Sequence, residues 1–148
     1  MNTKEHLQEI RDTVRTICES YGEDYWRKLD KDGGYPTDFV KEITASGFLG
    51  CLIPEEFGGA GLGLIEACAV LEEISRSGGH PGAAHAQMYV MGSVLRHGTA
   101  EQKQRYLPAV ARGELRLQSF GVTEPTTGTD TTSLKTCLLY TSPSPRDS

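Results

Sequence analysis

The feature that most constrains this chain is a helical spacing of apolar residues, repeated in several segments that each end at a glycine. In the first segment, the apolar residues at steps of three and four are Leu7, Ile10, Val14 and Ile17. Such steps place side chains on one face of an α-helix, and a glycine just beyond favours the left-handed turn that ends a helix. The same pattern recurs in segments that end near Gly47, Gly78, Gly98 and Gly113. The sequence therefore predicts a mainly α fold, with one helical domain over residues 1–113.

Two stretches depart from this helical spacing. The segment 47–63, GFLGCLIPEEFGGAGLG, is too rich in glycine for an ordinary helix and is predicted to cross the core as an ordered loop. After Gly113 the spacing becomes alternating, with Leu115 and Leu117 on one parity and Phe120 and Val122 on the other. This alternation predicts a short, twisted strand. Because one strand cannot form a sheet, residues 114–136 are interpreted as the truncated start of a β domain.

The charge pattern excludes one large class of function. The 148 residues include 15 Lys and Arg against 20 Asp and Glu, which gives a net charge of -5 without a basic run. This balance argues against a nucleic-acid partner bound through its phosphates. No apolar run approaches the ~18 residues of a membrane span, and the first residues resemble neither a signal core nor a transit peptide. The predicted location is the cytoplasm.

Residues that often carry chemistry give weak signals here. The four cysteines have neither a CxxC pair nor a histidine at zinc-finger spacing, so we expect buried, reduced thiols and no metal site. They are Cys18, Cys51, Cys68 and Cys137. His80 and His85 lie five positions apart, which does not place them on one helical face, and surface positions are favoured. Glu72 and Glu73 are interpreted as a solvated helix face and Glu124 as a turn residue, so no catalytic residue is assigned.

The most informative segment is FGVTEPTTGTD, residues 120–130, at the end of the predicted strand. Pro125 fixes one backbone angle, Gly128 permits a positive one, and the threonines supply hydroxyl groups. A turn of this composition can present several N–H groups to one anionic or polar ligand. A purely structural threonine-rich turn is an equally good interpretation of the same residues.

Four motifs in one order resemble the N-terminal part of the acyl-CoA dehydrogenase family. They are PEEFGGAGLG (54–63), EEIS (72–75), GTAEQKQRYLPAVARGE (98–114) and GVTEPTTGTD (121–130). The resemblance covers about residues 1–136 and implies an N-terminal helical domain followed by a middle β domain and a C-terminal four-helix bundle. It also implies FAD, bound between domains and between subunits, and a homo-oligomer, a dimer or a tetramer, in the full-length protein.

The resemblance also implies which residues would contact the ligands. The FAD contacts would be Phe120, Gly121, Val122, Thr123, Gly128 and Thr129. Of these, the backbone at Val122 and the backbone and hydroxyl of Thr123 would meet the pyrimidine edge of the flavin. Thr129, which stands where the family usually has Ser, would reach the FAD pyrophosphate and the CoA portion of the substrate. His85 and Met88 would line the far end of the acyl tunnel, and Thr126 stands where the family has Gly.

The implied reaction is α,β-dehydrogenation of an acyl-CoA thioester, with hydride transfer to FAD and reoxidation by an electron-transferring flavoprotein. The family's glutamate base belongs to the C-terminal bundle, so this chain is expected to be an inactive fragment. Three alternatives remain open: an acyl-CoA oxidase or a flavin monooxygenase of the same fold, or a non-enzymatic helical interaction module. Residues 137–148 resemble translated sequencing-adapter read-through and are interpreted as a non-native or disordered tail.

Overall fold

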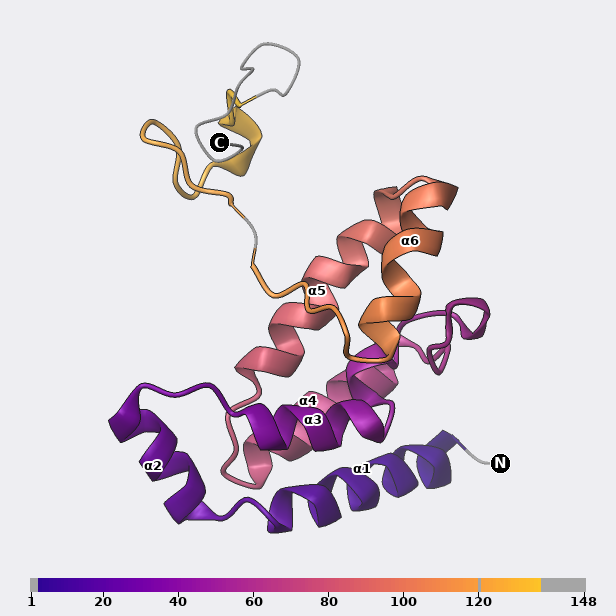
Figure 1. Ribbon diagram of the computed structural model, residues 1–148, viewed down its shortest axis with the longest axis vertical. Coiled ribbons are helices and arrows are strands. Elements are labelled where there is room, and N and C mark those ends of the chain that lie inside the picture. Colours follow the sequence, from indigo (N-terminus) through magenta and orange to yellow (C-terminus); the bar gives the residue numbers. More distant parts are fainter. Residues whose placement is uncertain (1–2, 120, 137–148) are drawn as a thin grey trace.

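The computed structural model describes residues 3–119 and 121–136, and within them the chain is helical (Figure 1). The α-helices are α1 (Thr3–Glu19), α2 (Glu23–Asp32), α3 (Thr37–Ala45), α4 (Leu64–Arg76), α5 (Gly82–His97) and α6 (Ala100–Ala111). Short 3-10 turns are η1 (Phe48–Gly50), η2 (Glu55–Phe57) and η3 (Thr131–Ser133). The predicted mainly α fold is confirmed. The interpretations of Phe120 and of residues 137–148 lie outside the described residues.

The first buried cluster joins α1, α3, α4 and the start of α5. Figure 1 shows α1 running along one side of α3 and α4. The spacing of the apolar residues in the sequence accounts for the packing, since Val14, Ile43, Val70 and Ile74 are each fully buried. Around α2, the rings of Tyr21, Tyr25, Trp26 and Phe39 pack edge to face with centroids about 5 Å apart.

The second buried cluster lies between α5 and α6 and consists of Ile53, Met91, Leu107 and Val110. The start of α6 is fixed by a capping box, in which Thr99 and Gln102 exchange side-chain and backbone hydrogen bonds. We expected Pro108 to bend α6 or to end its regular part. The regular part does not end at Pro108, because the helix continues to Ala111, with Leu107 and Val110 fully buried.

The glycine-rich loop 47–63 packs against the helices as the sequence predicts. Its backbone closes on itself, because the N–H of Gly61 donates to the carbonyl of Ile53 at 2.8 Å and that of Leu62 to Cys51 at 2.7 Å. Gly59 lies so close to Ile53 that a Cβ there would come within 2.1 Å of the Ile53 carbonyl oxygen. A glycine is therefore required at position 59 for the loop to close.

The short strand predicted after Gly113 is wrong for the described residues 114–119, which are irregular and begin with a bend, where the N–H groups of Glu114 and Leu115 donate to the carbonyl of Ala109. Within the described residues, the backbone contains only one isolated bridge, between Glu124 and Thr127, and no ladder. A strand needs neighbours to satisfy its backbone groups, and none of the described residues provides one. Leu115 and Leu117 instead pack against the second buried cluster. Figure 1 shows residues 121–136 standing apart from the helices.

Three side chains lie where the sequence did not predict them. Glu73, interpreted as part of a solvated face, is buried at 1% exposure, because Arg15 on α1 reaches it with an Nε to Oε1 distance of 2.8 Å. Cys68, expected to be buried, is exposed, while Cys18 and Cys51 are buried. Leu64, the apolar residue that begins α4, is 73% exposed.

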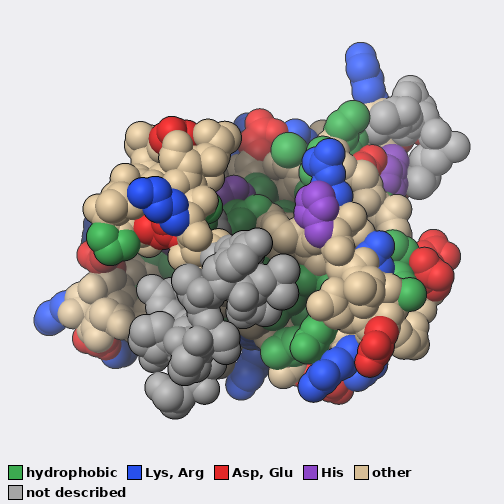
Figure 2. Space-filling model, turned by 90° about the horizontal axis from the view of Figure 1, so that it is seen from above, with side chains coloured by type: hydrophobic (Ala, Val, Ile, Leu, Met, Phe, Trp, Pro, Cys, Tyr) green, Lys and Arg blue, Asp and Glu red, His purple; other side chains and the backbone are tan. Residues whose placement is uncertain are grey.

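The surface of the described residues carries mixed charges. On the face in Figure 2, acidic and basic side chains are interspersed around the margin, and hydrophobic side chains are visible within a central recess. Within the described part of the chain, no helix has the length and apolar character that crossing a membrane requires.

Candidate functional site

The predicted ligand-binding turn closes on itself. Glu124 and Thr127 exchange backbone hydrogen bonds in both directions, at 3.0 and 3.1 Å, so Pro125 and Thr126 form the tip. Every described residue with a positive φ is a glycine, so Thr126 adopts an ordinary conformation there. The substitution of threonine at a position where the family has glycine is therefore compatible with the turn.

Two carboxylates hold the residues that follow. Glu124 accepts hydrogen bonds from the backbone N–H groups of Lys135 and Thr136, at 2.9 and 2.7 Å, and these bonds lower the pKa of Glu124. Asp130 accepts from the hydroxyls of Ser133 and Thr132, which lower the pKa of Asp130. Glu124 is thus a turn residue, as predicted, and it also ties the turn to the end of the described chain.

The predicted FAD contacts face outward from this turn. Gly121, Thr123, Gly128 and Thr129 are exposed, and Val122 is half-buried. Within the described residues, neither the Thr123 hydroxyl nor the Thr129 hydroxyl has a hydrogen-bond partner, and neither does the Thr123 N–H. Outward N–H and hydroxyl donors suit the carbonyl oxygens and ring nitrogens of a flavin, so the donor set fits FAD. The role of these residues stays a prediction.

The structure does not bring the two predicted acyl-tunnel residues to one surface. His85 is exposed on α5, where its ring packs edge to face with Tyr89 at a centroid distance of 5.0 Å. Met88 is 5% exposed and belongs to the first buried cluster. Residues three positions apart lie near one another on a helix, so Met88 belongs to the buried face of α5 and His85 lies just beyond the edge of that face. Their contact with an acyl chain is also still a prediction.

A hollow of about 710 Å³ lies beside α5 and was not predicted from the sequence. Its lining comes from α2, the α2–α3 loop, the α4–α5 loop, the first turn of α5 and residues 118–119. Aromatic and small residues dominate, among them Trp26, Tyr35, Ala83 and Ala86. These segments are far apart in the sequence, so no local pattern could have indicated the hollow.

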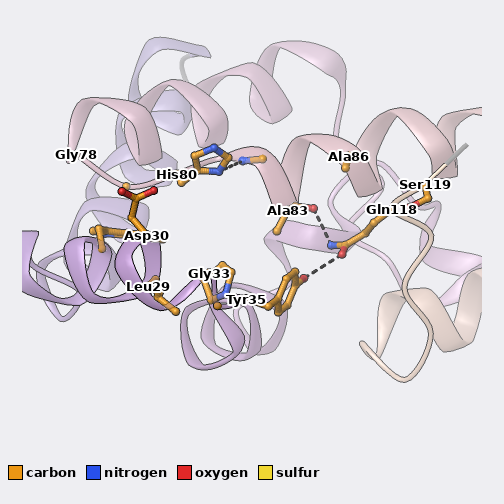
Figure 3. A pocket seen from close by; sticks show the side chains of 15 residues that line it. Leu29, Asp30, Gly33, Tyr35, Gly78, His80, Ala83, Ala86, Gln118 and Ser119 are labelled. Carbon is orange, nitrogen blue, oxygen red and sulfur yellow. Dashed lines mark hydrogen bonds between the residues drawn. The ribbon is translucent and has the colours of Figure 1, made fainter.

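Two polar groups of this hollow, the Tyr35 hydroxyl and the Ala83 carbonyl, meet at Gln118 (Figure 3). The hydroxyl of Tyr35 donates to Gln118 Oε1 at 3.0 Å, and Gln118 Nε2 donates to the carbonyl of Ala83 at 2.9 Å. On the other side, the N–H of Gly82 donates to His80 Nδ1 at 3.1 Å. No group of three or more His, Cys, Asp or Glu side chains in residues 3–119 and 121–136 could hold a metal ion.

Comparison with known proteins identifies the helical part of the chain. A family model described as "Acyl-CoA dehydrogenase, N-terminal domain" matches residues 4–114. The mitochondrial isovaleryl-CoA dehydrogenase of Solanum tuberosum is 33% identical over 133 residues, which cover 86% of this chain and 32% of that protein. The chain spans about a third of the length of the curated relatives it matches.

Two solved structures share the fold. The glutaryl-coenzyme A dehydrogenase in complex with glutaryl-CoA superposes with a TM-score of 0.75 at 30% identity, over 90% of this chain and 35% of that one. The Bacillus anthracis acyl-CoA dehydrogenase complexed with FAD superposes with a TM-score of 0.76 at 27% identity. That match covers 91% of this chain and 24% of the other.

Proposed function

Since this chain belongs to the acyl-CoA dehydrogenase family, we propose that its protein is a flavoprotein that catalyses α,β-dehydrogenation of an acyl-CoA thioester. The names of its relatives support this proposal, because they include an isovaleryl-CoA dehydrogenase and a dehydrogenase complexed with FAD. The observation that carries it is the turn closed between Glu124 and Thr127, beside which the Thr123 and Thr129 side chains are exposed and their hydroxyls have no hydrogen-bond partner among the described residues. We assign the activity to the full-length protein and expect this chain alone to be inactive.

The turn residues would act by holding FAD, which when bound would supply the hydride acceptor. The backbone N–H groups of Val122 and Thr123 and the Thr123 hydroxyl would donate to the pyrimidine edge of the flavin. Donors at this edge stabilise the negative charge that gathers there on reduction. Thr129 would donate its hydroxyl to the pyrophosphate and to the CoA portion of the substrate. Phe120, Gly121 and Gly128 would complete the contact, and no residue of this chain is proposed as the base.

The partners follow from the same proposal. We expect an acyl-CoA substrate, an electron-transferring flavoprotein as the oxidant and a homo-oligomer, a dimer or a tetramer. The cytoplasmic location stays a prediction, and the name of the potato relative places that protein in mitochondria. An oxidase or monooxygenase of the same fold would instead consume oxygen, so oxygen uptake during turnover separates these possibilities.

Replacing single hydroxyls of the turn tests the proposal in the full-length protein. Thr123→Ala is expected to weaken FAD binding about tenfold, because a hydrogen bond to a ring atom is lost without a compensating one. Thr126→Ala is the matched control, since Thr126 lies at the exposed tip of the same turn and is not among the proposed contacts. Retained FAD is measured from its visible absorbance after gel filtration, and flavin bleaching by an acyl-CoA is measured without oxygen.

The outcomes are distinct. Equal FAD retention in Thr123→Ala and Thr126→Ala would contradict the assigned contacts, and a full-length protein that never binds flavin would favour the non-enzymatic interaction module. The 148-residue chain alone is expected to retain no FAD. The physical reason is that no described residue outside the turn contributes to its exposed face, so a bound flavin would stay largely in water.

A further inference from the structure

Three parts of the chain that are distant in sequence meet at one carboxamide. Gln118 accepts from Tyr35, 83 positions earlier, and donates to Ala83, 35 positions earlier (Figure 3). We call this arrangement the Gln118 clamp, which consists of Tyr35, Ala83 and Gln118. It uses both ends of the carboxamide, the oxygen as acceptor and the nitrogen as donor.

Both partners of Gln118 have fixed positions. Tyr35 lies in the α2–α3 loop, where Gly33 ends α2 with a left-handed φ of 63° and the N–H of Gly34 donates to the carbonyl of Leu29 at 2.9 Å. Ala83 lies in the first turn of α5, beside the buried Ala84. The clamp therefore attaches the outgoing chain to the α2–α3 loop and to the first turn of α5.

The backbone on the other side of Gln118 is also held. Leu115 and Leu117 pack against the second buried cluster, while Gln118 has the opposite parity and turns toward the hollow. The segment 115–118 is thus fixed by apolar contacts on one side and by the clamp on the other. Gln118 is the last described residue before Gly121 that hydrogen-bonds to the helical part of the chain.

Beyond this point, the turn is tied only to itself. Within the described residues, all hydrogen bonds of residues 121–136 have both partners between Glu124 and Thr136. Thr123 lies five positions after Gln118, and an extended chain of five steps reaches about 17 Å. The clamp fixes the start of this span, so it limits Thr123 to positions within about 17 Å of Gln118. Loss of the clamp would lengthen the span that is not attached to the helical part of the chain.

We infer that Tyr35 and Gln118 are positioning residues, which limit how far the turn of residues 121–130 can lie from α5. The inference rests on the proposed function, since it assigns a purpose to the placement of the flavin contacts. The attachment of residue 118 to the helical part concerns only this chain and is testable without flavin.

Energy transfer from Trp26 to a dye on the turn measures how far the turn lies from the helical part of the chain. Trp26 is the single tryptophan, it lines the same hollow, and its indole N–H donates to the carbonyl of Tyr21 at 2.9 Å, so the donor is well held. An acceptor dye is attached at Thr126→Cys, with Cys68→Ser and Cys137→Ser to remove competing thiols. Time-resolved donor decay then gives the distribution of distances between Trp26 and the turn.

Removal of the clamp is expected to widen this distribution. Gln118→Ala removes both hydrogen bonds and should raise the fraction of molecules in which residue 118 is detached from α5 about tenfold. Tyr35→Phe removes one hydrogen bond and should raise the same fraction about threefold. Gln104→Ala and Tyr106→Phe are the matched controls, because both lie on α6 and neither side chain belongs to the clamp. An unchanged distribution in Gln118→Ala would overturn the inference, and so would equal widening in the controls.

In the full-length protein, FAD affinity and the visible flavin band show whether the clamp positions the flavin contacts or only holds the chain. Gln118→Ala should weaken FAD binding about fivefold and shift the visible flavin band, while Gln104→Ala changes neither. If the distance distribution widens but FAD affinity and the band stay constant, the clamp holds the chain without positioning the contacts, and the inference is wrong. A wild-type protein without flavin would contradict the proposed function, and the energy-transfer result would still decide whether the clamp exists.

Discussion

Gly59 is the position where one added methyl group should cost the most. A Cβ at residue 59 would lie 2.1 Å from the carbonyl oxygen and 2.4 Å from the Cβ of Ile53. Both atoms belong to a fully buried residue of the second cluster, so neither can move away cheaply. Gly59 does not have a positive φ, which means that the penalty of Gly59→Ala comes from the clash alone.

The structure sets the size of this penalty. Relief of the clash requires the Ile53 carbonyl to move by about 1 Å, which would break its 2.8 Å hydrogen bond from Gly61 at a cost of about 1 kcal/mol. Displacement of the Ile53 side chain from its packed position adds about 2 kcal/mol. Gly59→Ala is therefore expected to lower the free energy of unfolding by about 3 kcal/mol, and Tm by about 10 °C for a domain of this size.

Thermal unfolding followed by circular dichroism at 222 nm measures the change in Tm. Gly92→Ala is the matched control, because Gly92 lies within α5 and a Cβ there would meet nothing within 4 Å. That variant should gain about 0.5–1 kcal/mol, since alanine favours helix over glycine. A Tm of Gly59→Ala close to that of the wild type would refute the reasoning, because it would mean that the loop yields without loss.

Two further predictions concern buried groups. Glu73→Gln should lower the free energy of unfolding by about 1–2 kcal/mol in chemical denaturation, because it weakens a charge-assisted hydrogen bond to Arg15. Glu72→Gln on the same helix should change it by no more than about 0.5 kcal/mol. Equal losses in the two variants would contradict the buried pairing of Glu73 with Arg15. Burial raises the pKa of the Cys51 thiol to about 11, so the protonated form is favoured in the fold and stability should fall as the pH rises from about 9 toward 11. Iodoacetamide at pH 8 should label Cys68 in the native chain and Cys51 only after unfolding, as mass spectrometry would reveal.

The helical part of the fold could be predicted because its signals are local. The steps of three and four that place Val14 and Ile43 in the core, and the capping box of Thr99 and Gln102, lie within a few residues of one another. The turn at Glu124 could be predicted for the same reason, since Pro125 restricts the backbone directly and glycine, as at position 128, is common in turns. Such features need no knowledge of the distant parts of the chain.

The misplaced residues depend on partners that are distant in the sequence. Glu73 is buried because Arg15 lies 58 positions earlier on the helix that packs beside it, and neither residue's local pattern contains that information. Gln118 has the alternating spacing of a strand residue, yet its hydrogen bonds run to Tyr35 and Ala83 instead of to a neighbouring strand. An expected strand without a partner is thus a segment anchored by the side-chain hydrogen bonds of Gln118 and by the apolar contacts of Leu115 and Leu117. The same anchoring gives the proposed flavin contacts a fixed point on the helical domain, and no periodicity in the sequence could have indicated that.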